Sequence, residues 1–362
     1  MFLNIHQTSQ SDIDGSILGF TMPGGGFMLN KAEVQNIAQN YKVDFDTHQI
    51  IPLTGGEVNS TYLLQSDMDK YVIKKILLEQ CVDEYQKTID EVALSLHFVE
   101  EITRKQQPLG NVVTAVSGDT GSVLQNANNA YVLYPFYPGE ILENNKITLH
   151  MVKQISQRLK MLHHHPFSYD HELSRKRYTR FFNIGHAILD NSLLNDLISI
   201  KRLVPKLKPI INFITDNKSS LADSINLCTP GSVCHNDLKP KNVLWASQNN
   251  FAIIDWESAS DFDHRTDYLD TLICWSNQKE QDQFNFTPHK IQAFQEHYFI
   301  PKKELSYAMD IVIIKWYFWL FFCINKARSY PEKFLHYLEQ SNIALKFIEF
   351  LIKHRDLSFL NK

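Results

Sequence analysis

Three polar side chains in the second half of the chain have the types and the spacing that phosphoryl transfer needs. Asp237 and Asn242 lie five residues apart in one polar stretch, and Asp255 follows thirteen residues later, at the end of a short apolar run. The transfer needs a carboxylate at the attacking hydroxyl, oxygen ligands for magnesium and cations on the phosphates. Magnesium prefers a few hard oxygen ligands together with nucleotide phosphates. These three side chains can therefore bring a hydroxyl-orienting base and two metal ligands to one point.

The same residues resemble a known family. The pattern His235-x-Asp237-x4-Asn242, followed by Asp255, is similar to the catalytic and metal-binding loops of the aminoglycoside phosphotransferase and choline kinase superfamily, relatives of the protein kinases. The runs Cys-His-Asn-Asp-Leu and Ile-Asp-Trp-Glu look most like those of bacterial choline and ethanolamine kinases. The resemblance covers about residues 30–355 and is strongest between 231 and 270. It implies an α+β, two-lobed, protein-kinase-like fold and a cytoplasmic, ATP-dependent small-molecule kinase, with Asp237 as catalytic base and Asn242 and Asp255 as Mg²⁺ ligands.

The N-terminal part should then supply the ATP site. Strand-like runs near residues 50–53, 61–65 and 71–76, separated by a Gly-rich turn and a tight turn, predict an antiparallel meander. The first turn lies where the family covers the nucleotide phosphates, although two glycines alone most often mark only a hairpin. The residues expected to contact phosphate there are Gly55, Gly56, Asn59 and Ser60.

The third strand-like run resembles the family's strand that carries a phosphate-anchoring lysine. By that resemblance Lys74 contacts the α- and β-phosphates, and Glu91 on the following helix holds it by an ion pair. Lys75 is the alternative anchor, but side chains alternate along a strand and Lys75 would point to the opposite face. Glu84 and Asp90 are alternatives to Glu91.

Residues 134–140 resemble the inter-lobe hinge, where the backbone of Pro135 and Tyr137 would pair with adenine. Such main-chain contacts do not indicate whether ATP or GTP is preferred. His235 and Asp267 match residues that support the catalytic loop rather than react. Protein kinases carry a lysine at the position of Lys239 that approaches the γ-phosphate, but many small-molecule kinases lack it, so its role is open.

Two tryptophans near the C-terminus suggest an acceptor site. Trp316 and Trp319 share a helix face and are spaced as in choline kinases, and indole faces attract quaternary ammonium groups. Packing in a buried helix is the equally weighted alternative. Glu257 and Asp261 belong to an acidic stretch with Asp263, Asp267 and Asp270 that would also suit a cationic acceptor. The sequence differs from bacterial choline kinases after Glu257, where Ser-Ala-Ser replaces an aromatic residue and a glycine.

Three functions remain open on the sequence alone. The first is a kinase for a small cationic alcohol such as choline or ethanolamine. The second is a kinase for an aminoglycoside or another antibiotic, which would require a wide acidic cleft. The third is a pseudokinase that binds nucleotide as an interaction module, against which the intact Asp237, Asn242, Asp255 and Lys74 argue.

The composition is that of an ordinary globular protein. The 362 residues carry a formal net charge of −4 without a basic block, so neither nucleic acid nor a membrane surface is an expected partner. Five scattered cysteines fit a reducing cytoplasm. No signal peptide is expected, and the apolar run 311–324, interrupted by Lys315, is too short to span a bilayer. The oligomeric state is not indicated.

The predicted organisation has three parts. Residues 1–29 form a Gly-rich extension, residues 30–135 an N-lobe that binds nucleotide, and residues 136–362 a mostly helical C-lobe with the catalytic loop and the acceptor site. His163 to His165 end one helix, and because consecutive helical residues point in different directions, a structural role is expected rather than a metal site. Strands are predicted also at 111–116 and 131–135, and helices at about 31–41, 82–101, 148–164, 175–189, 194–215, 287–298, 305–326 and 331–353.

Overall fold

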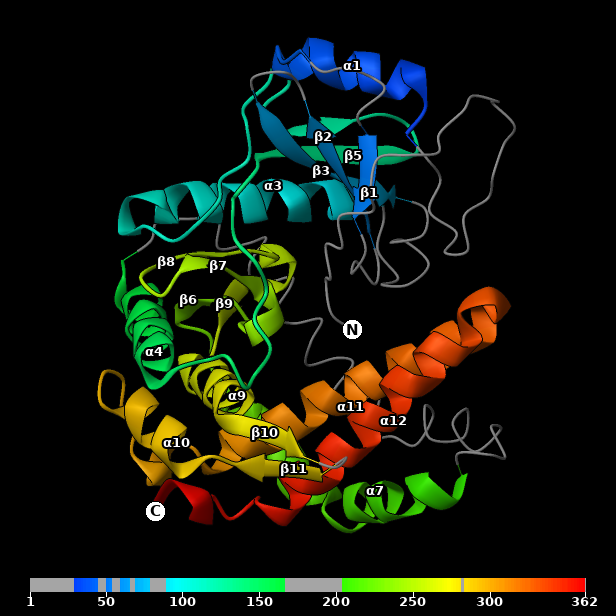
Figure 1. The fold of residues 1–362 in the computed structure, drawn as a ribbon. Helices are drawn as coiled ribbons and strands as arrows, with labels where there is room; N and C mark the ends of the chain where they lie inside the picture. Colours follow the sequence, from blue (N-terminus) through cyan, green and yellow to red (C-terminus); the bar gives the residue numbers. More distant parts are fainter. Residues whose placement is uncertain are drawn as a thin grey trace. The chain divides into compact units, whose positions relative to one another are not determined.

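A computed structural model describes residues 29–44, 50–53, 59–65, 69–78, 89–166, 204–280 and 283–361. These residues divide into two compact units (Figure 1). Unit 1 contains the described residues up to Ile141 together with Leu244–Ile254, and unit 2 contains Leu142–Val243 and the residues from Asp255 onward. The division after Ile141 falls six residues later than the expected boundary at 135, and it assigns the segment 244–254 to the first unit rather than to the C-lobe. The proposed extension, except for its last residue, lies outside the described residues.

Unit 1 is built on a five-stranded antiparallel sheet with the order β1-β2-β3-β5-β4. The strands are β1 (Ile50–Leu53), β2 (Ser60–Gln65), β3 (Lys70–Leu77), β4 (Val123–Gln125) and β5 (Asn129–Pro135). The predicted meander of three strands is therefore confirmed, with ends that differ by at most one residue.

One helix covers each face of this sheet (Figure 1). Helix α1 (Lys31–Tyr41) begins with a complete capping box between Asn30 and Glu33, and its apolar residues join Ile73 in one buried cluster. Helix α3 (Ile89–Gln106) packs through Val92 with Ile76 in a second cluster. Odd-numbered and even-numbered side chains of β3 thus face different helices, as a strand requires.

The prediction of a strand at 111–116 is wrong. Only Val112 forms a bridge there, a parallel one to Ile253, and the fourth strand lies further along the chain at Val123–Gln125. Ala115 and Val116 are apolar because they pack against the two clusters of the sheet. The segment 244–254 forms most of a hairpin, β7 (Val243–Ser247) and β8 (Asn250–Ile253), which that bridge and a Glu140–Trp245 bridge attach to the rest of unit 1.

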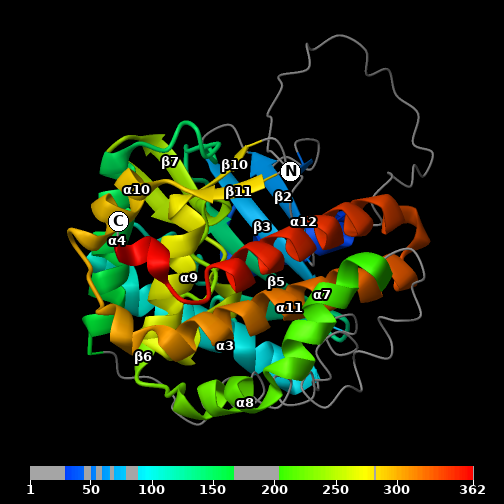
Figure 2. The ribbon, with the colours of Figure 1, turned by 90° about the horizontal axis from the view of Figure 1, so that it is seen from below.

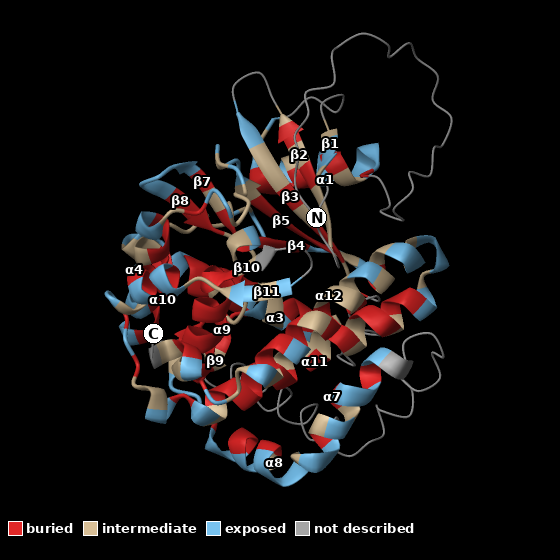
Figure 3. Ribbon diagram, turned by 60° about the horizontal axis from the view of Figure 1, so that its bottom comes forward, coloured by how far each residue is buried: buried red, intermediate tan, exposed pale blue. Residues whose placement is uncertain are grey.

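Unit 2 is mostly helical, and α11 (Ser306–Ser329) runs through its core beside α12 (Phe334–Lys353) (Figure 2). Helix α9 (His264–Ser276) is buried along almost its whole length (Figure 3). The other helices are α4 (Leu149–His164), α7 (Val204–Asp216), α8 (Lys218–Leu227) and α10 (Pro288–Gln295). Two short antiparallel pairs complete it: β6 (Ser232–Cys234) with β9 (Ser260–Phe262), and β10 (Asn277–Glu280) with β11 (Gln283–Phe286).

Most predicted helices of this unit are confirmed to within about a turn. The side chain of Thr148 caps α4, which begins at Leu149, one residue later than predicted. The helix predicted at 175–189 lies outside the described residues, and the one at 194–215 is described only from Val204. Helix α11 is long and apolar enough to cross a membrane, but 61% of its most apolar window is buried within the protein. It is therefore a core helix of unit 2.

Candidate active site

The predicted catalytic loop lies between β6 and β7 and is held by bonds within itself. The Asn242 side-chain amide donates to the backbone carbonyl of Asp237 and to its Oδ2, each at 2.8 Å. Lys239 Nζ forms an ion pair with the other carboxylate oxygen of Asp237 at 2.5 Å. A 3-10 turn, η2 (Pro240–Asn242), brings the chain back so that these side chains meet. The carboxylate of Asp237 is thus fixed on both sides while 22% of the side chain stays exposed.

Asp267, in the first turn of α9, anchors the loop. Its carboxylate accepts the backbone N–H groups of His235 at 3.0 Å and Asn236 at 2.9 Å. It also pairs with His163 Nε2 at 3.0 Å. Burial alone would raise the pKa of Asp267, but the bond and charge of His163 lower it. Asn236 has a φ of 62°, and its side chain bonds across to Ser260 Oγ at 2.9 Å. The positive φ and these bonds set the direction in which the loop presents Asp237.

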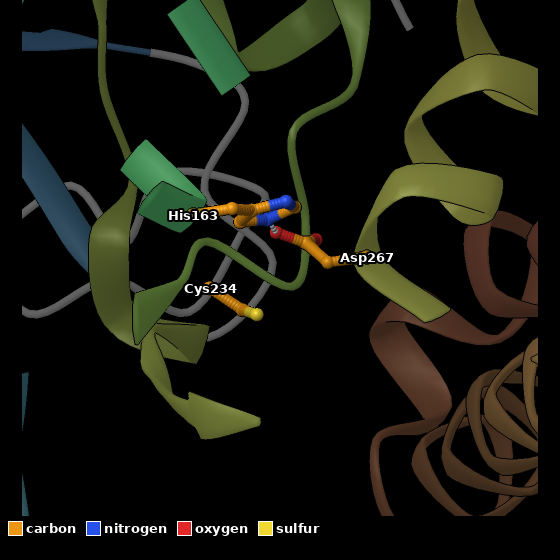
Figure 4. Close-up of side chains that lie close together, drawn as sticks. All are labelled: His163, Cys234 and Asp267. Carbon is orange, nitrogen blue, oxygen red and sulfur yellow. Dashed lines mark hydrogen bonds and ion pairs between the residues drawn. The ribbon is translucent and has the colours of Figure 1, made fainter. Parts of the chain in front are cut away.

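His163, Cys234 and Asp267 place their potential ligand atoms within 4.8 Å of one another (Figure 4). The cluster forms a structural network instead. Asp267 already accepts three hydrogen bonds, His163 Nδ1 bonds to Tyr298 Oη at 3.0 Å, and burial raises the pKa of the Cys234 thiol well above its usual range. His164 bonds to the carbonyl of Lys160 on its own helix, so the consecutive histidines do not converge.

Asn242 and Asp255 are suited to hold magnesium. Both N–H groups of the Asn242 amide are directed at Asp237, which leaves the amide oxygen as the atom that can bind a metal. Asp255 follows β8 with a φ of 62°, a left-handed conformation that costs about 1–3 kcal/mol in a non-glycine residue and is concentrated at functional sites. An amide oxygen and a carboxylate are the hard oxygen donors that magnesium prefers. The donor set therefore fits this ion.

The charges around Asp237 keep it ionised. Burial would raise its pKa, but the charges of Lys239 and Lys241 and the hydrogen bond from Lys239 lower it to about 2. A carboxylate of such low pKa is a weak base. Such a carboxylate is suited to accept a hydrogen bond from a hydroxyl group and to orient it.

In unit 1, the two adjacent lysines of β3 point to opposite faces of the sheet. Lys75 is buried against α1, where its Nζ pairs with Glu33 at 2.7 Å. Lys74 lies on the α3 side, where its charge acts on Glu100. The strand alternation therefore directs Lys75 into an ion pair with Glu33, and Lys74 stays the predicted phosphate anchor.

The carboxylates of α3 differ in their surroundings. Glu91 is exposed in the first turn, and its ion pair with Lys74 stays a prediction. Glu100, which sequence reasoning missed, is buried and accepts a hydrogen bond from Tyr134 Oη at 2.6 Å. Burial raises the pKa of Glu100, and the charge of Lys74 opposes that rise. The signal that would have found Glu100 is its place among the apolar positions of an amphipathic helix.

The turn that is predicted to bind the nucleotide phosphates is only partly described. Gly55 and Gly56 lie outside the described residues, whereas Asn59 directly precedes β2 and Ser60 begins it. Thr61, the next residue, pairs with Lys74 across the ladder. The end of the predicted turn is therefore beside the predicted phosphate anchor.

Most backbone N–H groups of the hinge-like segment 135–139 are bonded within the chain or absent. Phe136 N–H bonds to the carbonyl of Lys70 and Gly139 N–H to that of Tyr137, both at 2.9 Å, and Pro135 and Pro138 have no N–H. The remaining N–H of this segment is that of Tyr137, and the hydroxyl of Tyr137 bonds to Asn250 at 2.8 Å. We therefore expect the adenine contact at the Tyr137 amide.

The predicted acceptor tryptophans lie beside the catalytic loop. Lys239 Nζ is 4.6 Å from the centre of the Trp316 ring, and Lys241 Nζ is 6.0 Å from that of Trp319. Both indoles are half-buried. Glu257, in the 3-10 turn after Asp255, and Asp261, in β9 opposite Val233, are half-buried as well. The structure thus places the tryptophans next to the loop that carries Asp237.

The chain belongs to the phosphotransferase enzyme family (APH), whose family model matches residues 49–297. No curated protein matches the sequence. The fold is similar to that of spectinomycin phosphotransferase APH(9)-Ia in complex with ADP and spectinomycin, at 16% identity and a TM-score of 0.57 over 90% of this chain and 99% of that chain. An ethanolamine kinase from Plasmodium vivax matches at 13% identity and a TM-score of 0.58, over 92% of this chain and 94% of that one.

A choline kinase from Cryptosporidium parvum Iowa II is similar to the same degree, with 13% identity and a TM-score of 0.55 over 91% of this chain and 98% of that chain. The superfamily and the α+β, two-lobed kinase-like fold predicted from the sequence are confirmed. Identities this low show the fold alone, so the acceptor has to be inferred from the site.

Proposed function

We propose that the protein is a kinase that transfers the γ-phosphate of ATP to a hydroxyl group of a small molecule. The observation that carries the proposal is the fixed carboxylate of Asp237, held by the Asn242 amide and the Lys239 ammonium on a loop that Asp267 anchors. Nucleotide use is supported by the ADP-bound and AMP-bound structures of similar fold.

In this reaction the acceptor oxygen attacks the γ-phosphorus. The new O–P bond forms as the bond to the bridging β–γ oxygen breaks, and ADP leaves with that electron pair. Asp237 orients the hydroxyl and accepts its proton late, because its pKa of about 2 disfavours early proton transfer. Lys74 would contact the nucleotide phosphates and Tyr137 N–H the adenine. Magnesium held by Asn242 and Asp255 would neutralise phosphate charge when bound.

Replacement of the carboxylate of Asp237 tests this proposal. We expect Asp237→Asn to lower kcat by about 10²–10⁴-fold, the usual contribution of a positioned base, while MgATP affinity stays within a few-fold of wild type. ADP release measures the first quantity and calorimetry the second. Asp216→Ala, at an exposed position of α7, is the matched control. Wild-type turnover in Asp237→Asn would exclude the role given to this carboxylate.

A panel of acceptors separates the remaining functions. Choline, ethanolamine and several aminoglycosides represent the acceptors named for proteins of similar fold, and thiamine, methylthioribose, glycerol and hydroxy acids extend the range of charge. Acceptor-dependent ADP release that is lost in Asp237→Asn would support the kinase. MgATP binding without turnover on any acceptor would favour the pseudokinase.

A further inference from the structure

The charges beside Asp237 restrict the kind of acceptor that the proposed kinase can take. A cationic acceptor was expected because of two features, an acidic stretch at 257–270 and two indole faces on α11. Both features are present in the structure, and in both the groups concerned already have partners within the chain.

The acidic stretch is largely occupied by its own contacts. Asp263 is fully buried, and its carboxylate binds Arg265 at 3.0 Å and Tyr307 Oη at 2.7 Å. Asp270 is 4% exposed and pairs with Lys315 Nζ at 2.6 Å. Asp267 is 1% exposed and binds the catalytic loop and His163. Three of the four aspartates therefore support the fold and do not face an acceptor.

The indole faces are occupied as well. The ammonium group of Lys239 lies over the Trp316 ring, and that of Lys241 lies over the Trp319 ring. A quaternary ammonium acceptor needs the same π faces, because cation–π attraction acts over the ring. It would have to displace Lys239 from Trp316 and Asp237, or lie against two like charges.

The charged groups between the catalytic loop and α11 differ in their pairing. Asp237 and Lys239 neutralise each other, and so do Asp270 and Lys315. Lys241 is exposed and forms no ion pair within the described part of the chain. An acceptor whose hydroxyl reaches Asp237 and whose remaining part extends along α11 would therefore meet the ammonium group of Lys241 beside Trp319.

We propose that the acceptor is a hydroxyl compound with an anionic group, a carboxylate or a phosphate, which Lys241 binds beside Trp319. This inference rests on the proposed kinase function and names the substrate class of the same site. Lys241 is then the residue that determines specificity for charge. Lys239 remains with Asp237 and sets its charge and position. Hydrogen bonds between an ammonium group and such an anion are charge-assisted and stronger than neutral ones.

Three small probes of similar length test the inference without requiring turnover. 3-Hydroxypropionate, 1,3-propanediol and choline each have a primary hydroxyl, and their far ends are anionic, neutral and cationic. Binding to the full chain, saturated with MgADP so that the nucleotide phosphate sites are filled, is followed by ligand-observed NMR. We expect the anionic probe to bind more tightly than the other two.

Variants then locate the binding. Lys241→Met should weaken 3-hydroxypropionate about tenfold, which corresponds to about 1.4 kcal/mol. Lys241→Glu should abolish it and improve choline binding. Lys208→Met, which removes an exposed lysine of α7, is the matched control and should change nothing. Unchanged MgADP affinity verifies that each variant is folded.

Three results would overturn the inference. The first is that the anionic probe does not bind. The second is that 3-hydroxypropionate binds equally well to wild type and to Lys241→Met. The third is that choline binds to wild type and that Trp319→Leu removes this binding. The experiment measures binding and not turnover, so failure of the proposed kinase function can be distinguished from failure of this inference. If only the kinase function fails, the protein still prefers the anionic probe but releases no ADP in response to an acceptor.

Discussion

At the scale of single residues, the state of Asp237 is decided by its neighbours in the loop. The burial of a carboxylate raises its pKa, yet the ammonium group 2.5 Å away and that of Lys241 lower it to about 2. The depressed pKa means that the ionised form stabilises the folded chain. That stabilisation is present above the unfolded pKa of about 4 and is lost as the pH falls through about 2.

Lys239→Met should therefore shift the pH dependence of the enzyme. With the ion pair removed, burial is opposed mainly by Lys241, and the pKa of Asp237 should rise toward the ordinary range or above it. We expect the acidic limb of the kcat profile to lie below about pH 3 in wild type and to move to higher pH in the variant. The readout is the midpoint of the limb, measured with an acceptor from the panel, because the plateau also reflects other roles of Lys239. A midpoint that does not move would contradict the role assigned to this ion pair.

The side chains proposed for the chemistry were selected by their types and spacing, and the structure brings two of them, Asp237 and Asn242, into contact. Asp237, Asn242 and Asp255 have side chains that only a few reactions need, and their order along the chain is informative. The contacts of Lys239 and Lys241 with Trp316 and Trp319 could not be predicted, because they join residues more than 70 positions apart. The same is true of His163, whose partner Asp267 is 104 positions away.

At the scale of elements, β3 shows how one strand directs two adjacent side chains to different surroundings. Lys74 and Lys75 are adjacent in sequence, but strand geometry directs Lys75 to Glu33 under α1 and Lys74 to the α3 side. The Lys75 ion pair is almost fully buried, with side-chain exposures of 5% and 12%. Removal of one partner from such a pair leaves a buried charge without compensation and costs about 3–5 kcal/mol.

Replacement of each lysine by Met should therefore have opposite consequences. Lys74→Met should raise the KM for ATP and leave the free energy of unfolding nearly unchanged. Lys75→Met should lower the free energy of unfolding by a few kcal/mol and change the KM for ATP little. Urea unfolding and ATP titrations under the same conditions measure both. If Lys75→Met impaired ATP binding in a protein of normal stability, the assignment of the two faces would be wrong.

Elements with strong patterns were predictable, and elements with weak ones were not. The short apolar runs of β1 to β3, separated by turns, and the apolar faces of α4, α10, α11 and α12 determine their types. Helix α8 and the β10–β11 pair are short and mostly polar, and the few apolar residues in each form a pattern too brief to predict an element. Segment 111–116, which was wrongly predicted as a strand, is apolar because it packs against two clusters. An irregular segment that packs in this way has the same sequence pattern as a strand that is paired in a sheet.

At the scale of the whole molecule, the chain leaves the catalytic loop and returns to it. Asp237, Asn242 and Asp255 all belong to unit 2, whereas residues 244–254, which connect Asn242 to Asp255, belong to unit 1. The two proposed metal ligands are thus joined through the hairpin of the other unit. Binding of a ligand to the folded state stabilises it according to the ligand concentration and affinity. The metal-dependent part of nucleotide binding should consequently appear as thermal stability.

Asp255→Ala should remove the metal-dependent part of the stabilisation by nucleotide. In wild type, a nonhydrolysable ATP analogue with Mg²⁺ at a hundredfold excess over Kd should add about 2.7 kcal/mol of stability, and chelation of the metal should remove most of this gain. In Asp255→Ala we expect the same small gain with and without Mg²⁺, because a ligand of the metal is missing while Lys74 and the Tyr137 amide are intact. Differential scanning calorimetry measures the gain, and Asp216→Ala is the control for loss of a carboxylate in the same unit. A wild-type response to Mg²⁺ in Asp255→Ala would show that the metal is held elsewhere, and Asn242 would then have to be reassigned together with Asp255.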